Sequence, residues 1–581
     1  MISSYLPPAF IFIIGALILP VVSGRIKQIL ILIIPAAAFF YIVNLNVDVS
    51  WVVPFLDYKL NFLHVDKLSK VFGYIFCIAA FGSFLFAFHL KGKLEHFSAL
   101  IYVGSALGVV FAGDFFSLYL FWEFMAVASV MLIWARREKK SLDAGFRYVL
   151  VHIAGGLILL AGILLHVHTT GSLEVGKMQS HELSSWLILI GFMLNAAVPP
   201  LSAWLSDAYP ESTATGGVFL SAFTTKTAVY TLLRVFPGWE ILIWLGALMT
   251  LYGIIYAIME NDSRRILAYS IINQVGFMVC GIGIGTAMAL NGAAAHAFAH
   301  IIYKGLLWMS AGSVLYMTGK TKCTDLGGLY KTMPLTLICC CIAAASISAF
   351  PLTSGFTTKT MILQAAVDKH LIIIYTLLEA ASAGVFLHAG IKFPYFVFFA
   401  KDKGLRVSDP KPNMQYAMVF FAALCILIGI YPQPLYKILP YPVEYHAYTG
   451  MHVVRMLQLL FFSGLAFFVF LGLLKRTETL TLDTDWIYRK GTQLVLFVVT
   501  GIASGIARFF DFIFIRRLPE VLATFSKSPI SRITAITSHE TAAGNQGMNR
   551  APEFTTRIPS GVPVLLAVVF LSALAFVFIV G

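Results

Sequence analysis

The stretch HAFAHIIYKGLLWMSAGSV, residues 296–314, places His296, His300 and Lys304 in an apolar segment that contains no acidic residue. The three residues are spaced at i, i+4 and i+8, so on an α-helix they drift by only about 80° while rising about 12 Å. They therefore form a polar stripe along one face of a helix. Imidazole titrates at about pH 6.5 and both donates and accepts hydrogen bonds, so this stripe is competent to relay protons.

The composition of the chain indicates which solvent surrounds this stripe. Of 581 residues, 59% are hydrophobic and only 12% are charged, whereas soluble domains are about half apolar and about a quarter charged. Apolar runs of about 20 residues, long enough to cross about 30 Å of hydrocarbon as a helix, recur along the chain about sixteen times. Because helices satisfy their own backbone groups in lipid, we expect an all-α polytopic membrane protein.

The distribution of basic residues predicts the orientation in the membrane. Basic residues cluster in alternate connections, which include Arg25 and Lys27, ARREKK from Ala135, Arg264 and Arg265, and the loop from Lys401 to Lys411. By the positive-inside rule these loops lie in the cytoplasm, and both termini lie on the far side of a prokaryotic-type inner membrane. The net charge of +13 is thus a topology signal, and we expect no nucleic-acid partner.

Neither end-processing nor metal binding is indicated by the sequence. The run PPAFIFIIGALILPVVSG, which starts at Pro7, reads as a first span rather than as a cleavable signal peptide. The seven cysteines show no metal-ligand spacing and lie mostly within apolar runs, so we interpret them as packing residues.

Two apolar spans are interrupted by proline in the same manner. NAAVPPLSAWLSDA contains Pro199 and Pro200, and ISAFPLTSGFTTK contains Pro351, which lies 151 positions after Pro200. Both read Pro-Leu-hydroxyl-small. Such paired breaks are typical of transporters built from structural repeats, with the ion path at the broken helices. Coincidence among proline-bearing membrane helices is the alternative.

Further ionisable residues lie within apolar spans. An isolated charge at the centre of a bilayer costs about 2.5–3.5 kcal/mol, so such groups are expected to face one another or water. Coupled titrating groups could then move a proton sideways through the bundle. We interpret Lys392 as snorkelling towards the basic loop that follows it. The set comprises Glu123, Lys226, Lys359, Glu379, His388 and Lys392.

These residues belong to motifs that resemble a known family. The motifs, in chain order, are FWEF with Glu123, PLSAWLSDA from Pro200, LLRVFP after Lys226, NDSRRILAYS from Asn261, the 296–314 stretch, LGGLYKTMPLT from Leu326 and GFTTKTMIL around Lys359. Over about residues 60–400 the chain resembles the antiporter-like subunits of respiratory complex I. Mrp-type sodium/proton antiporters and membrane-bound hydrogenases contain the same kind of subunit. The extra C-terminal spans resemble those of the distal, longest complex I subunit.

The resemblance implies a core of fourteen helices with two inverted five-helix repeats, in which the seventh and twelfth helices are broken. It also implies a central hydrophilic axis, in which Glu123 matches the fifth-helix glutamate, Lys226 the eighth-helix lysine, His296, His300 and Lys304 the eleventh-helix relay, and Lys359 the twelfth-helix lysine. One position departs from the family pattern. Nine residues before Trp204 the family usually carries a lysine that pairs with the glutamate, and here that residue is Asn195. Either Lys226 takes over the ion pair with Glu123, or this half of the path is altered.

We expect five segments along the chain. They are the N-terminal spans (1–95), the proton-translocating core (96–400), the C-terminal core spans (401–475), a lateral helix with a polar connector (476–560) and a final transmembrane anchor (561–581). The apolar segment 485–517 could cross the membrane, but parity would then place the C-terminus in the cytoplasm. We therefore favour an amphipathic helix that lies along the flank of the bundle.

The leading hypothesis is translocation of protons, with coupling to Na⁺ left open, by a subunit of a multisubunit membrane complex. Expected partners are other membrane subunits, H⁺ or Na⁺, and the lipid bilayer, and Glu379 joins the residues of the resembling axis as a candidate. One alternative is a subunit of a redox-driven pump that oxidises NADH, hydrogen or formate, and another is a structural scaffold. Because no cysteine ligand set or Gly-rich nucleotide loop is present, we expect no catalytic residue, cofactor or metal in this chain.

Overall fold

The computed structural model describes residues 5–179, 181–472 and 483–527. Within these residues, ten helices are long and apolar enough to cross a membrane, and three shorter apolar helices accompany them. The prediction of an all-α polytopic membrane protein is confirmed, whereas fourteen core helices in two inverted repeats stay a prediction. The chain divides into two units, Met1–Asp485 and Trp486–Gly581.

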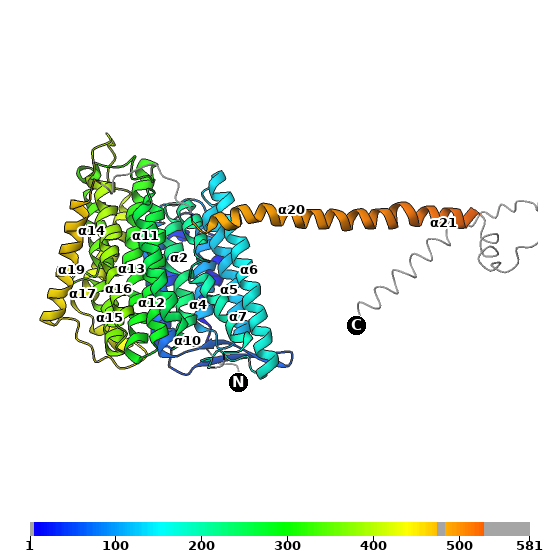
Figure 1. The fold of residues 1–581 in the computed structure, drawn as a ribbon, viewed down its shortest axis with the longest axis horizontal. Coiled ribbons are helices and arrows are strands. Elements are labelled where there is room, and N and C mark those ends of the chain that lie inside the picture. Colours follow the sequence, from blue (N-terminus) through cyan, green and yellow to red (C-terminus); the bar gives the residue numbers. More distant parts are fainter. Residues whose placement is uncertain (1–4, 180, 473–482, 528–581) are drawn as a thin grey trace, which may run out of the picture. The chain divides into compact units, whose positions relative to one another are not determined.

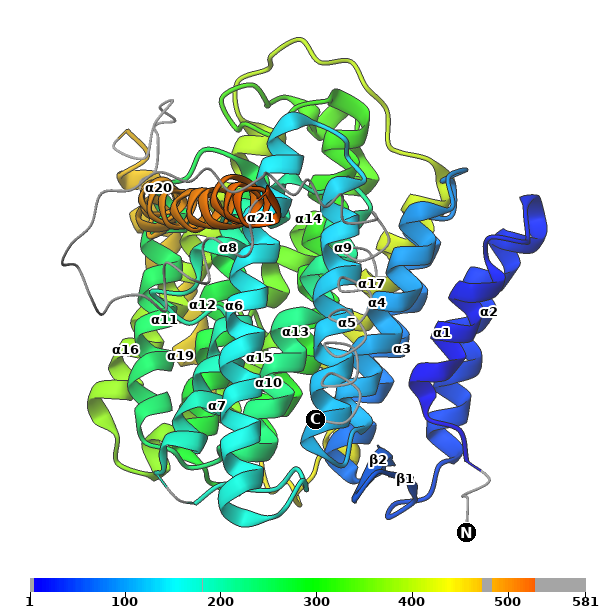
Figure 2. The same ribbon diagram turned by 90° about the vertical axis from the view of Figure 1, so that its right-hand side faces the viewer.

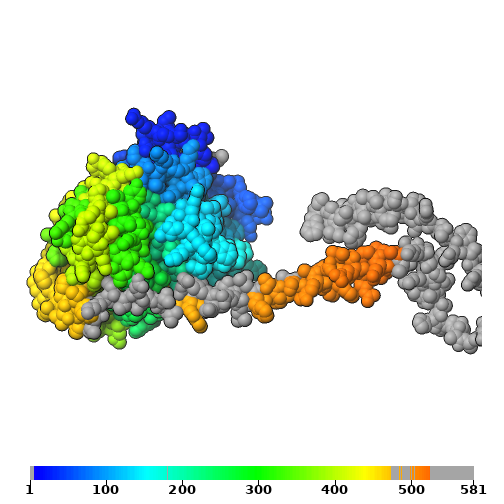
Figure 3. Space-filling view, turned by 90° about the horizontal axis from the view of Figure 1, so that it is seen from above, coloured from blue at the N-terminus to red at the C-terminus, as the bar shows by residue number. Residues whose placement is uncertain are grey.

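The N-terminal part of the first unit begins at the edge of the helix bundle. Figure 2 shows α1 and α2 at this edge, and Figure 3 shows the same blue segment at the rim of the bundle seen from one end. An antiparallel hairpin of β1 (Ser50–Phe55) and β2 (Tyr58–His64) follows them. The helices of this part are α1 (Pro8–Ile18), α2 (Gly24–Asn44), α3 (Lys67–Phe86), α4 (Leu94–Phe111), α5 (Phe115–Trp134) and α6 (Lys139–Thr170).

The central and C-terminal parts of the bundle contain the interrupted helices. The central elements are α7 (Leu183–Asn195), α8 (Ala203–Ala208), η1 (Tyr209–Glu211), α9 (Gly216–Ala222), α10 (Thr224–Val235), α11 (Ile241–Met259), α12 (Ser263–Ile284) and α13 (Ala287–Thr318). The later elements are η2 (Leu329–Lys331), α14 (Pro334–Ile347), α15 (Ser354–Asp368), α16 (Ile372–Val385), η3 (Phe386–Lys392), η4 (Tyr395–Phe399), α17 (Pro412–Ile430), α18 (Gln433–Ile438) and α19 (Gly450–Val469). Figure 1 shows α12 and α13 in the middle of the bundle.

The proline motifs lie between helices, as a residue without a backbone N–H requires. Helix α7 ends at Asn195 before Pro199 and Pro200, and α14 ends at Ile347 before Pro351. Ala197 and Ala349 each follow the last helical residue by two positions, and both have φ of 59°. The two breaks therefore share a left-handed residue at the same place, which an L-residue adopts only when the surrounding structure holds it.

Buried lysines close the ends of two helical segments. Lys27 Nζ donates to the carbonyls of Leu90, Lys91 and Gly92 at 2.8, 3.0 and 3.3 Å. Lys392 Nζ donates to the carbonyls of Ala257, Ile258 and Glu260, at the end of α11, at 2.9, 2.5 and 2.8 Å. The interpretation of Lys392 as a snorkelling residue is therefore wrong, because its side chain is only 4% exposed and satisfies carbonyls that the helix end leaves without partners.

A fully buried arginine holds the connection between α8 and α9. Arg264 donates to the carbonyls of Pro210, Ser212 and Thr213 at 2.7–2.9 Å. Its guanidinium also lies 5.2 Å from the centre of the Trp308 ring, on α13. Arg264 therefore fixes this irregular segment against the two central helices, α12 and α13.

The second unit begins with a long helix. Helix α20 (Asp485–Phe510) continues through the π-helical η5 (Asp511–Arg517) into α21 (Leu518–Lys527). The helix expected over 485–517 is therefore present, and its position along the bundle stays a prediction. The polar connector after Lys527 and the final span at 561–581 lie outside the described residues.

Asp483, at the end of the first unit, is a buried carboxylate that binds three hydroxyl groups. It accepts hydrogen bonds from Tyr269 on α12 at 2.7 Å, from Ser206 on α8 at 3.1 Å and from Tyr252 on α11. Its side chain is 5% exposed. The chain is thus fixed to three separate helices just before α20 begins.

We expect Asp483→Ala to destabilise the protein by about 3 kcal/mol or more, because each buried hydroxyl left without an acceptor costs about 1–3 kcal/mol. Thermal unfolding of the purified protein in detergent measures this effect. Asp368→Ala is the control, because Asp368 is exposed and should leave the unfolding midpoint almost unchanged. An unchanged midpoint in Asp483→Ala would contradict the assigned role of this carboxylate.

Candidate ion pathway

Helix α13 carries the central stripe of ionisable side chains. His296, His300 and Lys304 are each 0% exposed, although they stand in the middle of a 32-residue helix. The ring centres of His296 and His300 lie 6.3 Å apart, and His300 lies 5.2 Å from the ring of Tyr303. The spacing in the sequence therefore predicted a stripe that the structure places inside the protein.

Hydrogen bonds connect this stripe to the helices on either side. Two partners lie on α12. Lys304 Nζ donates to Ser270 Oγ at 2.8 Å, and His296 Nε2 lies 3.1 Å from Gln274 Oε1. His296 Nδ1 lies 3.3 Å from Thr358 Oγ1 on α15. These three partners were not predicted from the sequence. Ser270 and Gln274 could have been found as polar residues at i and i+4 in an apolar helix.

The two other fully buried lysines among the candidate residues, Lys226 and Lys359, bind carbonyls near helix ends. Lys226 Nζ, from α10, donates to Ser221 O near the end of α9 at 2.7 Å and to Thr225 Oγ1 at 3.0 Å. Lys359 Nζ donates to Ile347 O, the last residue of α14, at 3.5 Å, and lies 5.3 Å from the centre of the Phe277 ring. The negative end of a helix dipole stabilises an ammonium group there without a carboxylate.

No carboxylate neutralises these amines within the described residues. Lys226, Lys304 and Lys359 are all 0% exposed, and none of them has an acidic oxygen within 4.0 Å in the part of the chain that the structure describes. Lys226 is electrostatically coupled to both Lys304 and His300, and Lys359 is coupled to His296. Protonation of one group therefore affects the protonation of its neighbours.

The expected ion pair between Glu123 and Lys226 is wrong. The Lys226 amine is directed to the end of α9. The Glu123 carboxyl instead packs against Gly156 of α6, so closely that a methyl group on Gly156 would lie 2.0 Å from Glu123 Oε1. Oε1 has no hydrogen-bond partner among the described residues, and Tyr119 contacts the other side of the carboxyl group. Asn195, in the position of the missing lysine, is 2% exposed.

Glu379 is also placed away from the stripe. Its carboxylate forms an ion pair with Arg455 of α19, with Oε1 3.0 Å from Nε. Their side chains are 27% and 54% exposed, so the pair lies at the surface between α16 and α19. Arg455 also lies 4.9 Å from the Tyr375 ring. The structure therefore does not bring Glu379 together with the other candidate residues.

His388, rather than Glu379, occupies the interior position on this segment of the chain. It is 0% exposed, and its Nδ1 lies 2.8 Å from Gly384 O. It is electrostatically coupled to Lys304, Lys392 and Lys359. His388 lies in the π-helical η3, and π-helical turns occur frequently at functional sites.

Comparison with known proteins shows which family the central part of the chain resembles. Residues 112–384, which contain Glu123, the α13 stripe and Lys359, match the family described as "NADH:quinone oxidoreductase/Mrp antiporter, TM". Nearly half of the chain is thus similar to an antiporter family. The resemblance stated from the motifs is thereby confirmed.

Two curated relatives extend the comparison. Over 327 residues the chain is 33% identical to "NADH-quinone oxidoreductase subunit N" of Desulforudis audaxviator, an alignment that covers 51% of this chain and 65% of the relative. Over 468 residues it is 29% identical to one of the Na(+)/H(+) antiporter subunits of Alkalihalophilus pseudofirmus, covering 70% of this chain and 58% of the relative. The chain thus spans about three fifths of the length of these two relatives.

A similar fold has been solved in another membrane assembly. A chain of the membrane-bound sulfane sulfur reductase (MBS), an archaeal respiratory membrane complex, aligns with a TM-score of 0.70 at 24% identity. The alignment covers 91% of this chain and 98% of that chain. At this identity the likeness shows the fold alone.

The surface position of the Glu379–Arg455 pair generates a prediction about stability. In a double-mutant cycle with Glu379→Gln and Arg455→Gln, we expect a coupling energy of about 1 kcal/mol or less, because partly exposed ion pairs contribute about 0.2–1 kcal/mol. Thermal or denaturant unfolding in detergent measures the four proteins of the cycle. A coupling energy above about 2 kcal/mol, as expected for a buried pair, would contradict the surface position of this pair.

Proposed function

We propose that this chain translocates protons across a membrane as an antiporter-like subunit of a multisubunit complex, with Na⁺ as the alternative ion. One observation carries the proposal, namely the row of fully buried amines and imidazoles without a neutralising carboxylate among the described residues. Its members are Lys226, His296, His300, Lys304 and Lys359. Such groups are costly in a membrane, which favours a functional role over a structural one.

The distance between neighbouring sites supports stepwise transfer of charge. At the 6.3 Å that separates the His296 and His300 rings, two positive charges repel by about 2.6 kcal/mol at an effective dielectric constant of about 20. This corresponds to almost two decades in a protonation equilibrium. A proton that enters at one site therefore favours release from the next, so the row conducts charge sideways through the bundle.

Partners and orientation follow from the relatives and from the basic connections. Both curated relatives are named as subunits, which supports sister membrane subunits as partners. Three of the basic connections lie together at one end of the bundle, because Lys322 bridges to Asp262 and Arg136 pairs with Glu211, which lies within the segment that Arg264 binds. We propose that this end faces the cytoplasm of a prokaryotic cell.

A second candidate function places the same row in a redox-driven complex. The name "NADH-quinone oxidoreductase subunit N" and the respiratory MBS complex favour it. In that case electron transfer in other subunits would drive the protonation changes, and the role of the buried amines would be the same.

We expect Lys304→Met and Lys359→Met each to lower proton uptake into proteoliposomes by at least about tenfold, since methionine retains the apolar stem of lysine and removes the titrating amine. The measurement uses the complex purified from its native membrane and a pH-sensitive dye. Lys27→Met is the matched control, because Lys27 is a buried lysine outside the proposed row that binds three carbonyls in the described part of the chain.

The control variant should retain proton uptake once its folding is confirmed. Undiminished uptake in both Lys304→Met and Lys359→Met would refute the proposed row. A parallel assay with a Na⁺ gradient decides between the two ions, because only the translocated ion should discharge its own gradient.

A further inference from the structure

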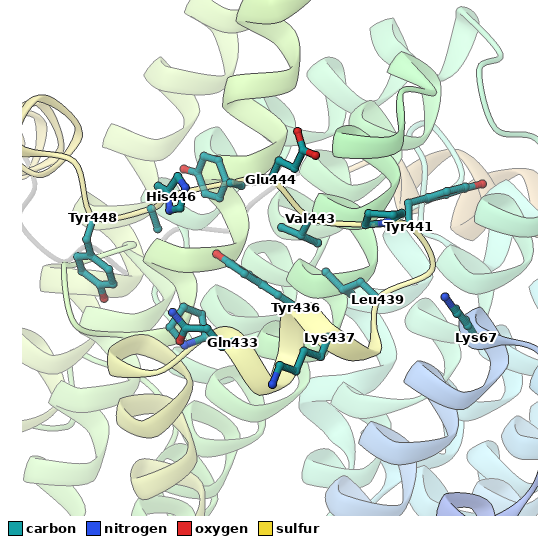
Figure 4. Close-up of a pocket in the computed structure, with 14 residues that line it drawn as sticks. Lys67, Gln433, Tyr436, Lys437, Leu439, Tyr441, Val443, Glu444, His446 and Tyr448 are labelled. Atoms are coloured by element: carbon teal, nitrogen blue, oxygen red, sulfur yellow. The ribbon is translucent and has the colours of Figure 1, made fainter.

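An open pocket of about 650 Å³ lies at the end of the bundle next to α15. Its wall is the segment 432–448, which contains α18 and the stretch that leads to α19, and Lys67 at the start of α3 lies opposite. Figure 4 shows Tyr436 extending from α18 between the labelled Lys437 and Glu444, with His446 farther along the same stretch. None of the candidate residues described above lines this pocket.

Two tyrosines of this segment bind the helix that carries Lys359. Tyr436 Oη donates to Thr357 O at 2.6 Å, and Tyr445 Oη donates to Thr360 Oγ1 at 2.9 Å. Thr357 and Thr360 stand at i and i+3, so they share one face of α15. They are 0% and 2% exposed, whereas both tyrosines line the open pocket. One layer of side chains thus separates the pocket from the buried face of α15.

The opposite side of the same helical turn faces the row of ionisable groups. Thr358 contacts His296, and the Lys359 amine lies at Ile347 O. Lys359 therefore stands between the row on one side and the tyrosine layer on the other. Its flexible four-carbon stem allows the amine to turn towards the row or towards the tyrosine layer.

The segment that carries Tyr445 is anchored on both sides of it. The backbone of Tyr441 exchanges hydrogen bonds with the Asn291 side chain at 2.9 and 3.1 Å. Tyr448 Oη donates to Gly429 O and accepts from Leu352 N at 3.2 Å. The hydrogen bond from Tyr445 to Thr360 therefore lies between two anchored residues, Tyr441 and Tyr448. This bond can break while the hydrogen bonds of Tyr441 and Tyr448 persist.

The chemistry of the intervening layer selects a small cation or proton. The two hydrogen bonds from this wall to α15 use hydroxyl and carbonyl oxygens, which coordinate small hard cations and pass protons along hydrogen bonds. Burial raises the pKa of Tyr445 to about 12, and the Thr360 hydrogen bond opposes this shift. The Tyr445 hydroxyl is therefore protonated at neutral pH and acts as a neutral donor.

We propose that this pocket is the ion-access vestibule of Lys359 and that the contact between Tyr445 and Thr360 is its gate. The vestibule takes water and a proton or small monovalent cation. This inference rests on the proposed function for the identity of the ion, but the access of water to α15 can be tested without any ion flux.

The test places a reporter thiol behind the gate and measures its accessibility. In Thr357→Cys the backbone carbonyl that binds Tyr436 is retained. The new thiol replaces a hydroxyl that donates to Ser354 O and lies near Ile428 O, one helical turn from the contact of Tyr445 with Thr360. Labelling with a membrane-impermeant thiol reagent is followed in oriented vesicles of the native complex, against the seven native cysteines as background. We expect Tyr445→Phe to raise the labelling rate of this thiol by about tenfold from the side of α18, the equivalent of one lost hydrogen bond of about 1.4 kcal/mol.

The matched control is Tyr441→Phe, which removes a hydroxyl from the same pocket wall while leaving the backbone bonds to Asn291 intact. It should label at the parental rate, and Tyr436→Phe provides a second gate variant in case Tyr445→Phe does not fold. Equal labelling rates in the gate variants and in Tyr441→Phe would overturn the proposal, as would labelling from the opposite side.

Proton flux measured on the same vesicles separates this inference from the proposed function. A Tyr445→Phe variant with faster labelling and an increased passive proton leak supports both. Faster labelling without any change in proton flux supports the vestibule and counts against the proposed row of proton carriers. A changed flux with unchanged labelling contradicts the gate alone.

Discussion

The absence of a neutralising carboxylate near Lys226, Lys304 and Lys359, within the described residues, is the constraint on which the rest of this structure depends. A buried ammonium group without a counter-charge is stable only if oxygen atoms of the protein replace its water. Here those oxygens are Ser221 O, Ser270 Oγ and Ile347 O. Hydroxyls and single carbonyls hold an ammonium group less tightly than a carboxylate does, so each amine retains the ability to exchange its proton.

The helix interruptions supply two of these oxygens. Helices α9 and α14 end inside the bundle, and their last turns present carbonyls that lack partners within the helix. Pro351, together with the left-handed residue Ala349, ends α14 at the place where Lys359 needs an acceptor. Arg264 and Asp483 serve the same architecture, because they fix irregular segments that the broken helices leave between spans. Irregular backbone at membrane depth is tolerated where it is buried in protein in this way.

The sequence predicted those features that depend on spacing along one element. The stripe of His296, His300 and Lys304 follows from i, i+4 and i+8 positions, and the ends of α7 and α14 follow from the prolines. It could not predict which face of a helix meets which neighbour. Glu123 and Lys226 both lie in apolar spans, yet their side chains point to different helices, α6 and α9. Likewise Glu379 and His388 follow each other along one helical segment, but only His388 faces the interior.

The central claim is that the buried amines and imidazoles titrate as one coupled set. Infrared pH titration of the complex in membranes, read at the bands of protonated lysine and imidazole, tests it most directly in the wild type and in Lys304→Met. We expect the variant to lose the contribution of Lys304 to the lysine signal and also to shift the titration of the imidazole bands, since Lys304 is coupled to His300 and His388. Imidazole titration identical in the two proteins would contradict the claim.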